Sequence, residues 1–316
     1  MRALRFERYG PPSVLQLQDM GVPELTAGLV LIRVEASAIN PSDVKNVAGA
    51  FHATLPRVPG RDYAGTVVAG DDRWAGKQVW GSGSGFGVVH DGAHAQFVVA
   101  PIEGLSAKPS RLSMEQAATV GVPYLAAWSS LVDAAGIQRG ETILVNGVGG
   151  AVGHAATQVA HWKGAKVIGA DVHDRPADAD LFINTTGKDL ATEVKSLTRG
   201  TGVDLVLDCV GGPTFESSLN SLRLRGRQVA IASIKRRVEF DLVDFYHGER
   251  RLIGVDTVKL TAAQIAAIMD RLVEGFDTGH LKPASITTWP LAKAIEAYTA
   301  VEKGSATKHV LLPQQS

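Results

Sequence analysis

The hydrophobic pattern of the first part of the chain is typical of short strands. Up to about residue 117, apolar runs alternate with turns marked by Gly and Pro, such as Gly10–Pro12 and Val58–Gly60. This pattern predicts an all-β barrel or sandwich. The expected strands are 3–6, 14–19, 30–37, 63–69, 78–80 and 95–100. The segment 81–87 is so rich in glycine that we expect a mobile loop that does not pack.

From Ser113 onward the period of the pattern changes. Ser113 followed by Gln116 is typical of a helix N-terminus, and the apolar spacing from there to Ala135 predicts helix with a break near Pro123. Strands are then expected at 142–146, 166–170, 181–184, 205–208, 227–232 and 252–257, and helices at 152–163, 188–198 and 213–222. This alternation predicts a doubly wound parallel sheet that binds its ligand at the carboxyl ends of the strands. The connection 171–180 is too short for a full crossover helix.

The last part of the chain predicts two helices and two strands. The helices are expected at 262–273 and 291–303, and the strands at 285–289 and 308–312. Because the chain ends on a strand, we expect it to return and complete the sheet of the first domain. The predicted fold class is therefore α/β, with a Rossmann-type sheet at 118–258 and a β-rich barrel domain formed by 1–117 and 259–316.

A glycine-rich turn joins the first strand of the parallel sheet to an Ala-rich helix. It reads Gly147-Val148-Gly149-Gly150-Ala151-Val152-Gly153. Glycine is needed where such a turn takes a positive φ, where the backbone approaches a pyrophosphate, and where the helix packs tightly on the strand. The free N–H groups and the helix dipole then face the phosphates. Val148 stands where a strict GxGxxG pattern has its first glycine, so Gly147 or Gly149 takes that role.

The second strand of the sheet ends in an acid that bears on the choice of cofactor. The carboxylate of Asp171 can accept hydrogen bonds from the ribose hydroxyls and would repel a 2′-phosphate. Arg175, in the same connection, can hold a phosphate if Asp171 turns away. We therefore expect NAD(P)H, with a preference for NADH. The expected cofactor contacts are Gly147, Gly149, Gly150, Ala151, Val152, Gly153, Asp171, Arg175, Val210, Gly211, Ala232 and Ser233.

Composition and charge indicate which kinds of partner the protein is expected to bind. The chain has 45% hydrophobic and 20% charged residues, as soluble globular proteins do, and its 32 basic and 32 acidic residues cancel. We therefore expect a small-molecule substrate, and no nucleic-acid or membrane partner. The first residues lack the apolar core of a signal peptide, and the single cysteine, Cys209, cannot form an intramolecular disulfide. A cytoplasmic location is expected.

Five motifs occur in a family-specific order along the chain. They are Tyr9–Leu15, Ala38–Asp43, Pro59–Gly65, the glycine turn and Asp208–Gly212. With them the chain resembles, from end to end, the zinc-independent quinone oxidoreductases (ζ-crystallin-like) of the medium-chain dehydrogenase/reductase superfamily. The resemblance implies a GroES-like first domain and a homodimer formed through the strand at 252–257.

The zinc alcohol dehydrogenases of the same superfamily differ from this chain at their metal ligands. They carry Cys where this chain has Asn40, His where it has Arg61, and Cys near Val122. The comparison implies no metal site, because catalytic zinc needs three N, S or carboxylate ligands. Without a metal ion to polarise an isolated carbonyl, hydride transfer is easiest to a conjugated acceptor. We therefore expect a quinone or an α,β-unsaturated carbonyl compound as the substrate.

The resemblance implies that Asn40 donates a hydrogen bond to the developing oxyanion. The alternative is that Asn40 only stabilises the turn before Pro41. Asp43 and Asp62 are expected to hold Arg61 rather than to touch substrate.

The proton donor of the relatives cannot be carried over to this chain. Where many relatives have a tyrosine, the chain has Phe51-His52, and Ala126 replaces a cofactor-facing threonine. The remaining proton sources are Tyr63, His52 and solvent, and Tyr63 is our candidate. These departures leave open a non-catalytic protein that binds the dinucleotide as a sensor or structural ligand. A zinc alcohol dehydrogenase is a third hypothesis.

Overall fold

A computed structural model describes residues 1–315, in which the chain passes from one structural unit into a second and then returns. Unit 1 comprises residues 1–122 and the segment from Val258 to the C-terminus, and unit 2 comprises Pro123–Thr257. The boundaries predicted from the sequence were 117/118 and 258/259. Within the described residues, every helix is too short or too polar to span a membrane.

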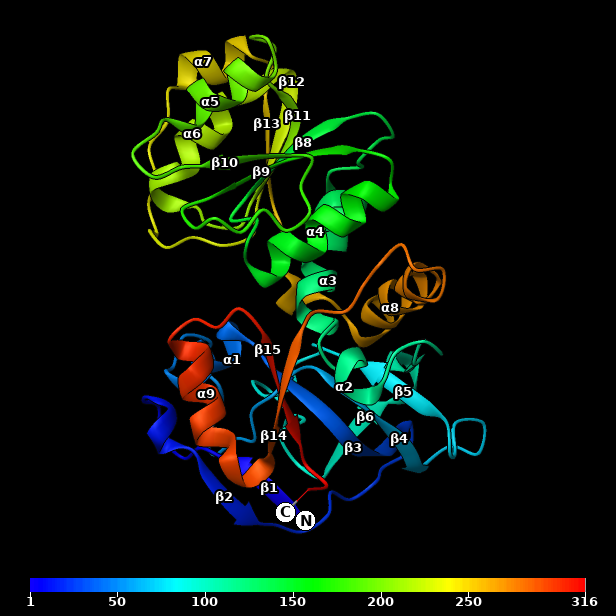
Figure 1. Ribbon diagram of the computed structural model, residues 1–316. Helices are drawn as coiled ribbons and strands as arrows, with labels where there is room; N and C mark the ends of the chain where they lie inside the picture. Colours follow the sequence, from blue (N-terminus) through cyan, green and yellow to red (C-terminus); the bar gives the residue numbers. More distant parts are fainter. Residues whose placement is uncertain (316) are drawn as a thin grey trace. The chain divides into compact units, whose positions relative to one another are not determined.

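Unit 2 contains a six-stranded sheet in which all neighbouring strands are parallel (Figure 1). The order is β10-β9-β8-β11-β12-β13, as the predicted doubly wound fold requires. The strands are β8 (Thr142–Asn146), β9 (Lys166–Asp171), β10 (Leu181–Asn184), β11 (Val203–Asp208), β12 (Leu222–Ala230) and β13 (Arg251–Gly254). The helices are α4 (Ala151–Trp162), α5 (Leu190–Leu197), α6 (Phe215–Asn220) and α7 (Leu242–His247).

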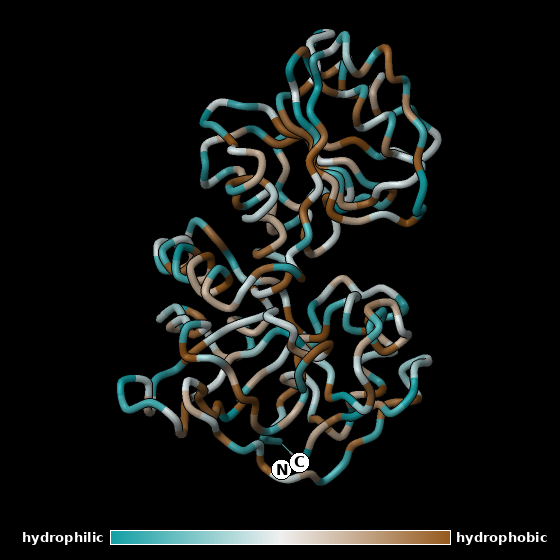
Figure 2. The backbone as a smooth tube through the Cα atoms, turned by 180° about the vertical axis from the view of Figure 1, so that it is seen from behind, coloured by the Kyte–Doolittle hydropathy of each residue, from teal (hydrophilic) through white to brown (hydrophobic). Residues whose placement is uncertain are grey.

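The centre of this sheet is apolar because helices cover both of its faces. Ile143, Leu144 and Val145 of β8 have no exposed surface, and the strands form a hydrophobic centre in Figure 2. Leu144 belongs to a core cluster that also contains Val194 of α5 and Leu219 of α6. The connection between β9 and β10 contains no helix, as its length predicted.

Unit 1 is built on a second sheet, which the end of the chain completes. The order is β14-β15-β3-β4-β5-β7, with β6 paired to β3. The strands are β3 (Leu29–Ile39), β4 (Tyr63–Ala69), β5 (Gln78–Gly81), β6 (Phe97–Pro101), β7 (Ser106–Ala107), β14 (Ile286–Pro290) and β15 (Lys308–Leu312), and β1 (Arg2–Arg5) pairs with β2 (Gln16–Asp19). Val310 of β15 lies opposite Ala38 of β3, which confirms the predicted return of the chain.

The helices of unit 1 include one that the sequence analysis missed. They are α1 (Pro41–Val47), α2 (Met114–Ala117), α8 (Ala262–Asp277) and α9 (Ala294–Glu302), and α3 (Gly121–Trp128) crosses the unit boundary. The expectation of an all-β unit is wrong at α1. Asn40 is the N-cap of this helix, and the Asp43 carboxylate accepts the Asn40 N–H at 2.8 Å. Two turns of helix are too short to show an apolar period, so capping was the only signal.

The glycine-rich segment 81–87 packs against the core, contrary to expectation. Ser82 and Phe86 are buried, and the Phe86 ring meets the Tyr63 ring edge-on at 5.8 Å between centroids. Gly83, Gly85 and Gly87 have positive φ angles. The glycines therefore provide the turns that bring the buried side chains of this segment inward.

Candidate functional site

The glycine turn of unit 2 has the close packing that a dinucleotide site requires. Gly147 has a φ of +79°, and its N–H donates to the Ala170 carbonyl at 2.8 Å. A Cβ at Gly153 would lie 2.3 Å from the Gly147 carbonyl oxygen. Glycine at Gly153 is thus what allows α4 to approach the turn.

The N-terminus of α4 is open to a ligand. Gly150 is its N-cap and offers no side chain, and Ala151 and Val152 begin the helix. A Cβ at Gly150 would meet only the Gly147 carbonyl oxygen, at 3.4 Å. The first N–H groups of a helix lack intrahelical partners, and its N-terminus carries about half a positive charge. This geometry suits a phosphate group.

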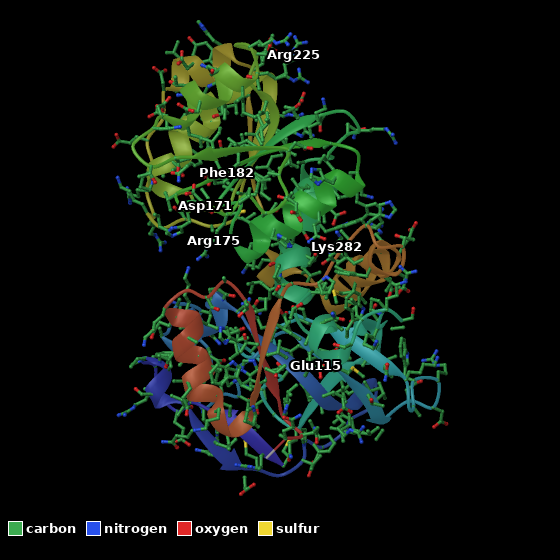
Figure 3. All side chains as sticks on the ribbon, viewed as in Figure 1. Glu115, Asp171, Arg175, Phe182, Arg225 and Lys282 are labelled. Atoms are coloured by element: carbon green, nitrogen blue, oxygen red, sulfur yellow. The ribbon has the colours of Figure 1, made fainter. Side chains whose placement is uncertain are left out.

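Asp171 ties the end of β9 to the glycine turn. One of its carboxylate oxygens accepts the Gly149 N–H and the other accepts the His173 N–H, each at 3.0 Å. A carboxylate has about four lone-pair positions, so Asp171 can still accept bonds from hydroxyl groups. Arg175 lies beside it: a Cβ on Gly149 would be 2.7 Å from the Arg175 Cβ and 3.1 Å from the Asp171 carboxylate. The two residues that bear on cofactor choice therefore share one edge of the sheet (Figure 3).

The remaining predicted cofactor residues also meet at this edge. The Ile234 N–H donates to the Val210 carbonyl at 3.2 Å. A Cβ at Gly211 would lie 2.5 Å from the Ala232 carbonyl oxygen and 2.8 Å from the Ser233 Cα. The segment after β11 and the segment after β12 are thus in direct contact. β12 ends at Ala230, two residues before the predicted end of this strand.

Two polar residues that the sequence analysis did not assign to the site hold this edge together. The Asp208 carboxylate accepts bonds from the Asn146 side chain (3.1 Å), the Val210 N–H (3.1 Å) and the Gly211 N–H (2.8 Å). Asn146 and Asp208 end neighbouring strands, β8 and β11. The signal in the sequence was a polar side chain at the end of each of two apolar runs.

A buried polar network surrounds Asn40 in unit 1. The Asn40 Nδ2 donates to Asp62 Oδ2 at 2.8 Å, and Lys308 Nζ donates to Asn40 Oδ1 at 2.5 Å. The exposed fractions of Asn40, Asp62 and Lys308 are 1%, 0% and 8%. Lys308, which lies 268 residues from Asn40, was not predicted to belong to this site. The available signal in the sequence was a lysine at the first position of the C-terminal strand.

Asp62 is the acceptor at the centre of the network. Its Oδ1 accepts the Val122 N–H at 2.9 Å and the Ser82 hydroxyl. A Cβ at Gly121 would lie 2.3 Å from this oxygen, so the turn before α3 approaches the carboxylate closely. Burial raises the pKa of Asp62, and the charge of Lys308 opposes that shift. Burial likewise lowers the pKa of Lys308, against the attraction of Asp62 and Asp43.

An ion pair lies beside this network. The Arg61 Nε donates to Asp43 Oδ1 at 3.0 Å, and the Arg61 guanidinium also binds the Ser42 hydroxyl. The expectation that an acid holds Arg61 is confirmed for Asp43. It is wrong for Asp62, whose partners are Asn40, Ser82 and Val122.

Tyr63 is a core residue of unit 1. It is 1% exposed and belongs to an apolar cluster with Ile32 and Val79. Burial raises the pKa of its hydroxyl well above the ordinary value of 10.0. A Cβ at Gly81 would lie 2.5 Å from this hydroxyl, so the ring is closely enclosed. These surroundings are those of a core side chain, and the expectation that Tyr63 donates a proton to a substrate stays a prediction.

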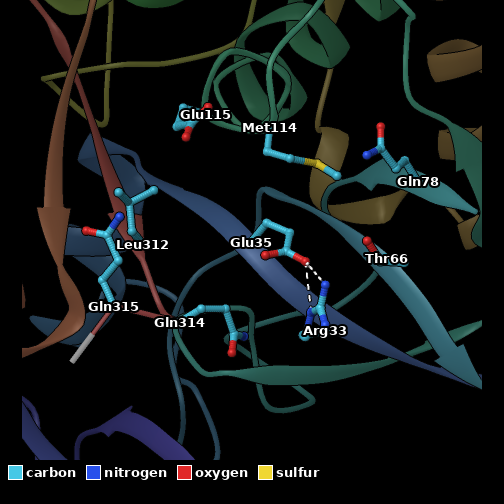
Figure 4. Close-up of a pocket in the computed structure, with 9 residues that line it drawn as sticks. All are labelled: Arg33, Glu35, Thr66, Gln78, Met114, Glu115, Leu312, Gln314 and Gln315. Carbon is cyan, nitrogen blue, oxygen red and sulfur yellow. Dashed lines mark hydrogen bonds and ion pairs between the residues drawn. The ribbon is translucent and has the colours of Figure 1, made fainter. Parts of the chain in front are cut away.

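A surface hollow of about 350 Å³ in unit 1 lies apart from these residues. Figure 4 shows its lining, which includes the Arg33–Glu35 ion pair at 2.7 Å, Gln78 and Met114. Neither the Asn40 network nor any predicted cofactor residue lines it. We therefore assign it no part in the site.

Known domain families match segments in each of the two units. Residues 26–110 match the alcohol dehydrogenase GroES-like domain, and residues 151–274 match the zinc-binding dehydrogenase family. A zinc-type alcohol dehydrogenase-like protein of Schizosaccharomyces pombe is 35% identical over 98% of this chain and 97% of its own length. The quinone oxidoreductase of Homo sapiens is 29% identical over 99% of this chain and 97% of its own. A mycobacterial protein solved in complex with NADPH has a TM-score of 0.87 and 28% identity, over 99% of this chain and 100% of that one.

The residues near Asn40 do not fit the zinc ion that one of these families is named for. Within residues 1–315, no group of three or more His, Cys, Asp or Glu side chains is placed to hold a metal ion. Around Asn40 the side chains are an amide, the Lys308 ammonium, the Asp62 carboxylate and, beside Asp43, the Arg61 guanidinium. Two buried cations repel a divalent metal ion, and neither offers it a lone pair when protonated.

Proposed function

The chain belongs to the medium-chain dehydrogenase/reductase superfamily, and we propose that it is an NAD(P)H-dependent reductase whose acceptor is a quinone or an α,β-unsaturated carbonyl compound, reduced without a metal ion. The observation that carries the proposal is the buried amide–ammonium–carboxylate network of unit 1. It provides a neutral hydrogen-bond donor where the zinc members place metal ligands.

In this proposal the carboxyl edge of the unit 2 sheet holds the cofactor. The N–H groups of Ala151 and Val152 at the start of α4 bind the pyrophosphate, and the Asp171 carboxylate accepts the ribose hydroxyls. Val210, Gly211, Ala232 and Ser233 form the adjoining part of the edge. Bound NAD(P)H supplies the hydride.

Asn40 acts on the acceptor through a hydrogen bond. Its Nδ2 carries two N–H groups, of which one is directed to Asp62, and the other donates to the acceptor's carbonyl oxygen. Because Asn40 is 1% exposed, an oxygen that reaches it is largely removed from water, which strengthens the bond to a developing negative charge. A conjugated acceptor spreads that charge, so an amide donor suffices in place of a metal ion.

The test is oxidation of NADH and of NADPH by purified protein with a panel of quinones and enones, alongside elemental analysis. We expect saturable turnover with at least one acceptor and no stoichiometric transition metal. Saturable cofactor fluorescence with no turnover on any acceptor would favour the non-catalytic binder instead. That alternative is favoured by Phe51-His52, by Ala126 and by the buried position of Tyr63. Stoichiometric zinc would favour an alcohol dehydrogenase.

We also propose that two copies associate through the last strand of the unit 2 sheet. β13 pairs with β12 on one side and is the end of the strand order. Its Leu252 is 43% exposed, and the exposed side chains of Leu242 and Tyr246 lie on α7, which precedes it. An edge strand with exposed apolar side chains favours pairing with a second copy.

A further inference from the structure

Asn40 lies between two groups of opposite charge. Lys308 Nζ donates to its Oδ1 at 2.5 Å, and its Nδ2 donates to Asp62 Oδ2 at 2.8 Å. An ammonium group can only donate hydrogen bonds, and an ionised carboxylate can only accept them. The two neighbours therefore determine which end of the amide is oxygen and which is nitrogen. With the opposite orientation, both hydrogen bonds would be lost.

The charges of this region balance without a metal ion. Lys308 is compensated by Asp62 through the amide, and Arg61 by Asp43 at 3.0 Å. Asp62 also accepts the Ser82 hydroxyl and the Val122 N–H. A buried charge is costly unless it is paired and hydrogen-bonded, and both cations and both acids meet this condition.

A hydrogen bond to an amide oxygen makes the N–H groups of the same amide stronger donors, because hydrogen bonds in a chain polarise one another. This effect is largest where the surroundings are dry, and all three members of the chain are buried. Lys308 therefore acts on the same N–H group that the proposed function assigns to the acceptor's oxygen.

We propose that Lys308 is a positioning residue that replaces the metal ion of the zinc-containing members electrostatically, by orienting and polarising the Asn40 amide toward the acceptor's oxygen. This inference rests on the proposed function. Lys308 itself need not touch the substrate, because its effect passes through Asn40. Lys308 is the first residue of β15, which pairs with β3, the strand that ends just before Asn40.

The test compares four proteins: wild type, Lys308→Met, Lys308→Arg and the control Lys303→Met, which removes an exposed lysine. Lys308→Met should lower kcat tenfold or more, while the Kd for NADH and NADPH stays within about twofold of wild type. Lys308→Arg should recover part of the loss, because arginine also donates to Oδ1. Lys303→Met should match wild type.

A pH profile separates positioning from a purely structural role. Burial lowers the pKa of Lys308 from its ordinary value of 10.5, against the charges of Asp62 and Asp43, which raise it, and the charge of Arg61 lowers it further. kcat should therefore fall on an alkaline limb that begins below pH 10.5, as the ammonium loses its proton. In Lys308→Arg this limb should move to higher pH or vanish, because the guanidinium stays charged.

The outcomes separate this inference from the function on which it rests. Turnover by wild type with an unchanged kcat in Lys308→Met would overturn the inference alone. So would a loss in Lys308→Met that lies entirely in cofactor Kd. If wild type reduces no acceptor, the proposed function fails and this inference with it. If Lys308→Met does not fold, Lys308→Met/Asp62→Asn removes both charges; its folded form should still have the lowered kcat, and a wild-type kcat would overturn the inference.

Discussion

Single residues at the site are constrained by what their neighbours can donate or accept. Asn40 is held by one donor and one acceptor, and Asp171 by two backbone N–H groups. In both cases the fold uses part of the hydrogen-bonding capacity of the side chain and leaves the rest for a ligand. Substitutions at these two positions therefore test ligand binding directly.

Replacing Asn40 by alanine should lower kcat by roughly tenfold or more, because the oxyanion loses its donor. It also leaves Lys308 without its acceptor, so thermal stability should fall. Steady-state kinetics with the best acceptor, at equal cofactor saturation, measures the first effect. Asn46→Ala is the control, since the Asn46 side chain donates to the Gly87 carbonyl at 2.7 Å and is not part of the Asn40 network. An unchanged kcat in Asn40→Ala would return Asn40 to the role of a helix cap.

Replacing Asp171 by serine should raise the use of NADPH relative to NADH. The substitution removes a carboxylate that repels the 2′-phosphate, while Arg175 remains nearby to bind it. The ratio of kcat/KM for the two cofactors measures the change. Asp174→Ser, in the same connection, is the control, because Asp174 binds the Asn184 side chain. The same ratio in Asp171→Ser and wild type would remove the argument for NADH.

Whole elements of secondary structure carry the site because their ends meet. The turn before α4 depends on two glycines for different reasons. Gly153 makes room for the helix, whereas a Cβ at Gly150 would make only an ordinary contact, with the Gly147 carbonyl oxygen at 3.4 Å. The first is required for packing, and the second keeps the helix N-terminus accessible.

Replacing Gly150 by valine should therefore abolish cofactor binding and leave the protein folded. The added Cβ would meet only the Gly147 carbonyl oxygen, at 3.4 Å, and the valine side chain would fill the space in front of the N–H groups of α4. Fluorescence titration with NADH and NADPH measures binding, and circular dichroism measures folding. Gly153→Val should behave differently and destabilise unit 2, since its Cβ would meet the Gly147 oxygen. Wild-type affinity in Gly150→Val would contradict the phosphate site.

A buried histidine, His94, joins helix α9 to the rest of unit 1. Because its pKa is shifted by burial, the free energy of unfolding should depend on pH. His94 Nδ1 accepts the Tyr298 hydroxyl at 2.8 Å, and Nε2 donates to the Ala38 carbonyl at 3.2 Å. Burial lowers the pKa of His94 below 6.5. The folded state thus binds a proton less readily than the unfolded state, so this contribution is present above pH 6.5 and is lost as pH falls through the folded-state pKa.

Urea unfolding from pH 7 to pH 5 should show a falling free energy of unfolding, by at most about 1.4 kcal/mol per pH unit for this one group. His94→Gln should have a smaller slope over the same range. His309, whose pKa burial also lowers, contributes to the slope that remains. The exposed residue His90 provides the control substitution His90→Gln. An equal slope in His94→Gln and wild type would show that His94 is not the source.

At the scale of the whole molecule, the sheet of unit 2 has two edges at which a second copy of the chain could pair. β13 ends the sheet on one side and β10 on the other. Leu252→Asp should weaken self-association, because it places like charges opposite each other where two β13 strands pair. Light scattering coupled to size exclusion measures the mass. Leu181→Asp on β10 is the matched control, as Leu181 is also exposed. A dimer that persists in Leu252→Asp, or a monomeric wild type, would contradict the proposed pairing.

Most of the parallel sheet was predictable because its signals are local. Each strand is a short apolar run, and the glycine turn lies between consecutive elements, so neighbours in sequence are neighbours in space. Helix α1 and the packed segment 81–87 were not predictable in this way. The first is too short to show a period, and the second is buried through positive φ angles that sequence alone does not assign.

The sequence by itself determined the fold class, the glycine turn and Asp171 as the end of β9, since each depends on residues close together in the chain. The tertiary structure alone decided what surrounds Asn40. Lys308 reaches it only because β15 pairs with β3, and Tyr63 lies in the apolar core of unit 1. Hydrogen-bond partners across 268 residues depend on strand pairing and burial. These are properties of the folded chain, which no local pattern encodes.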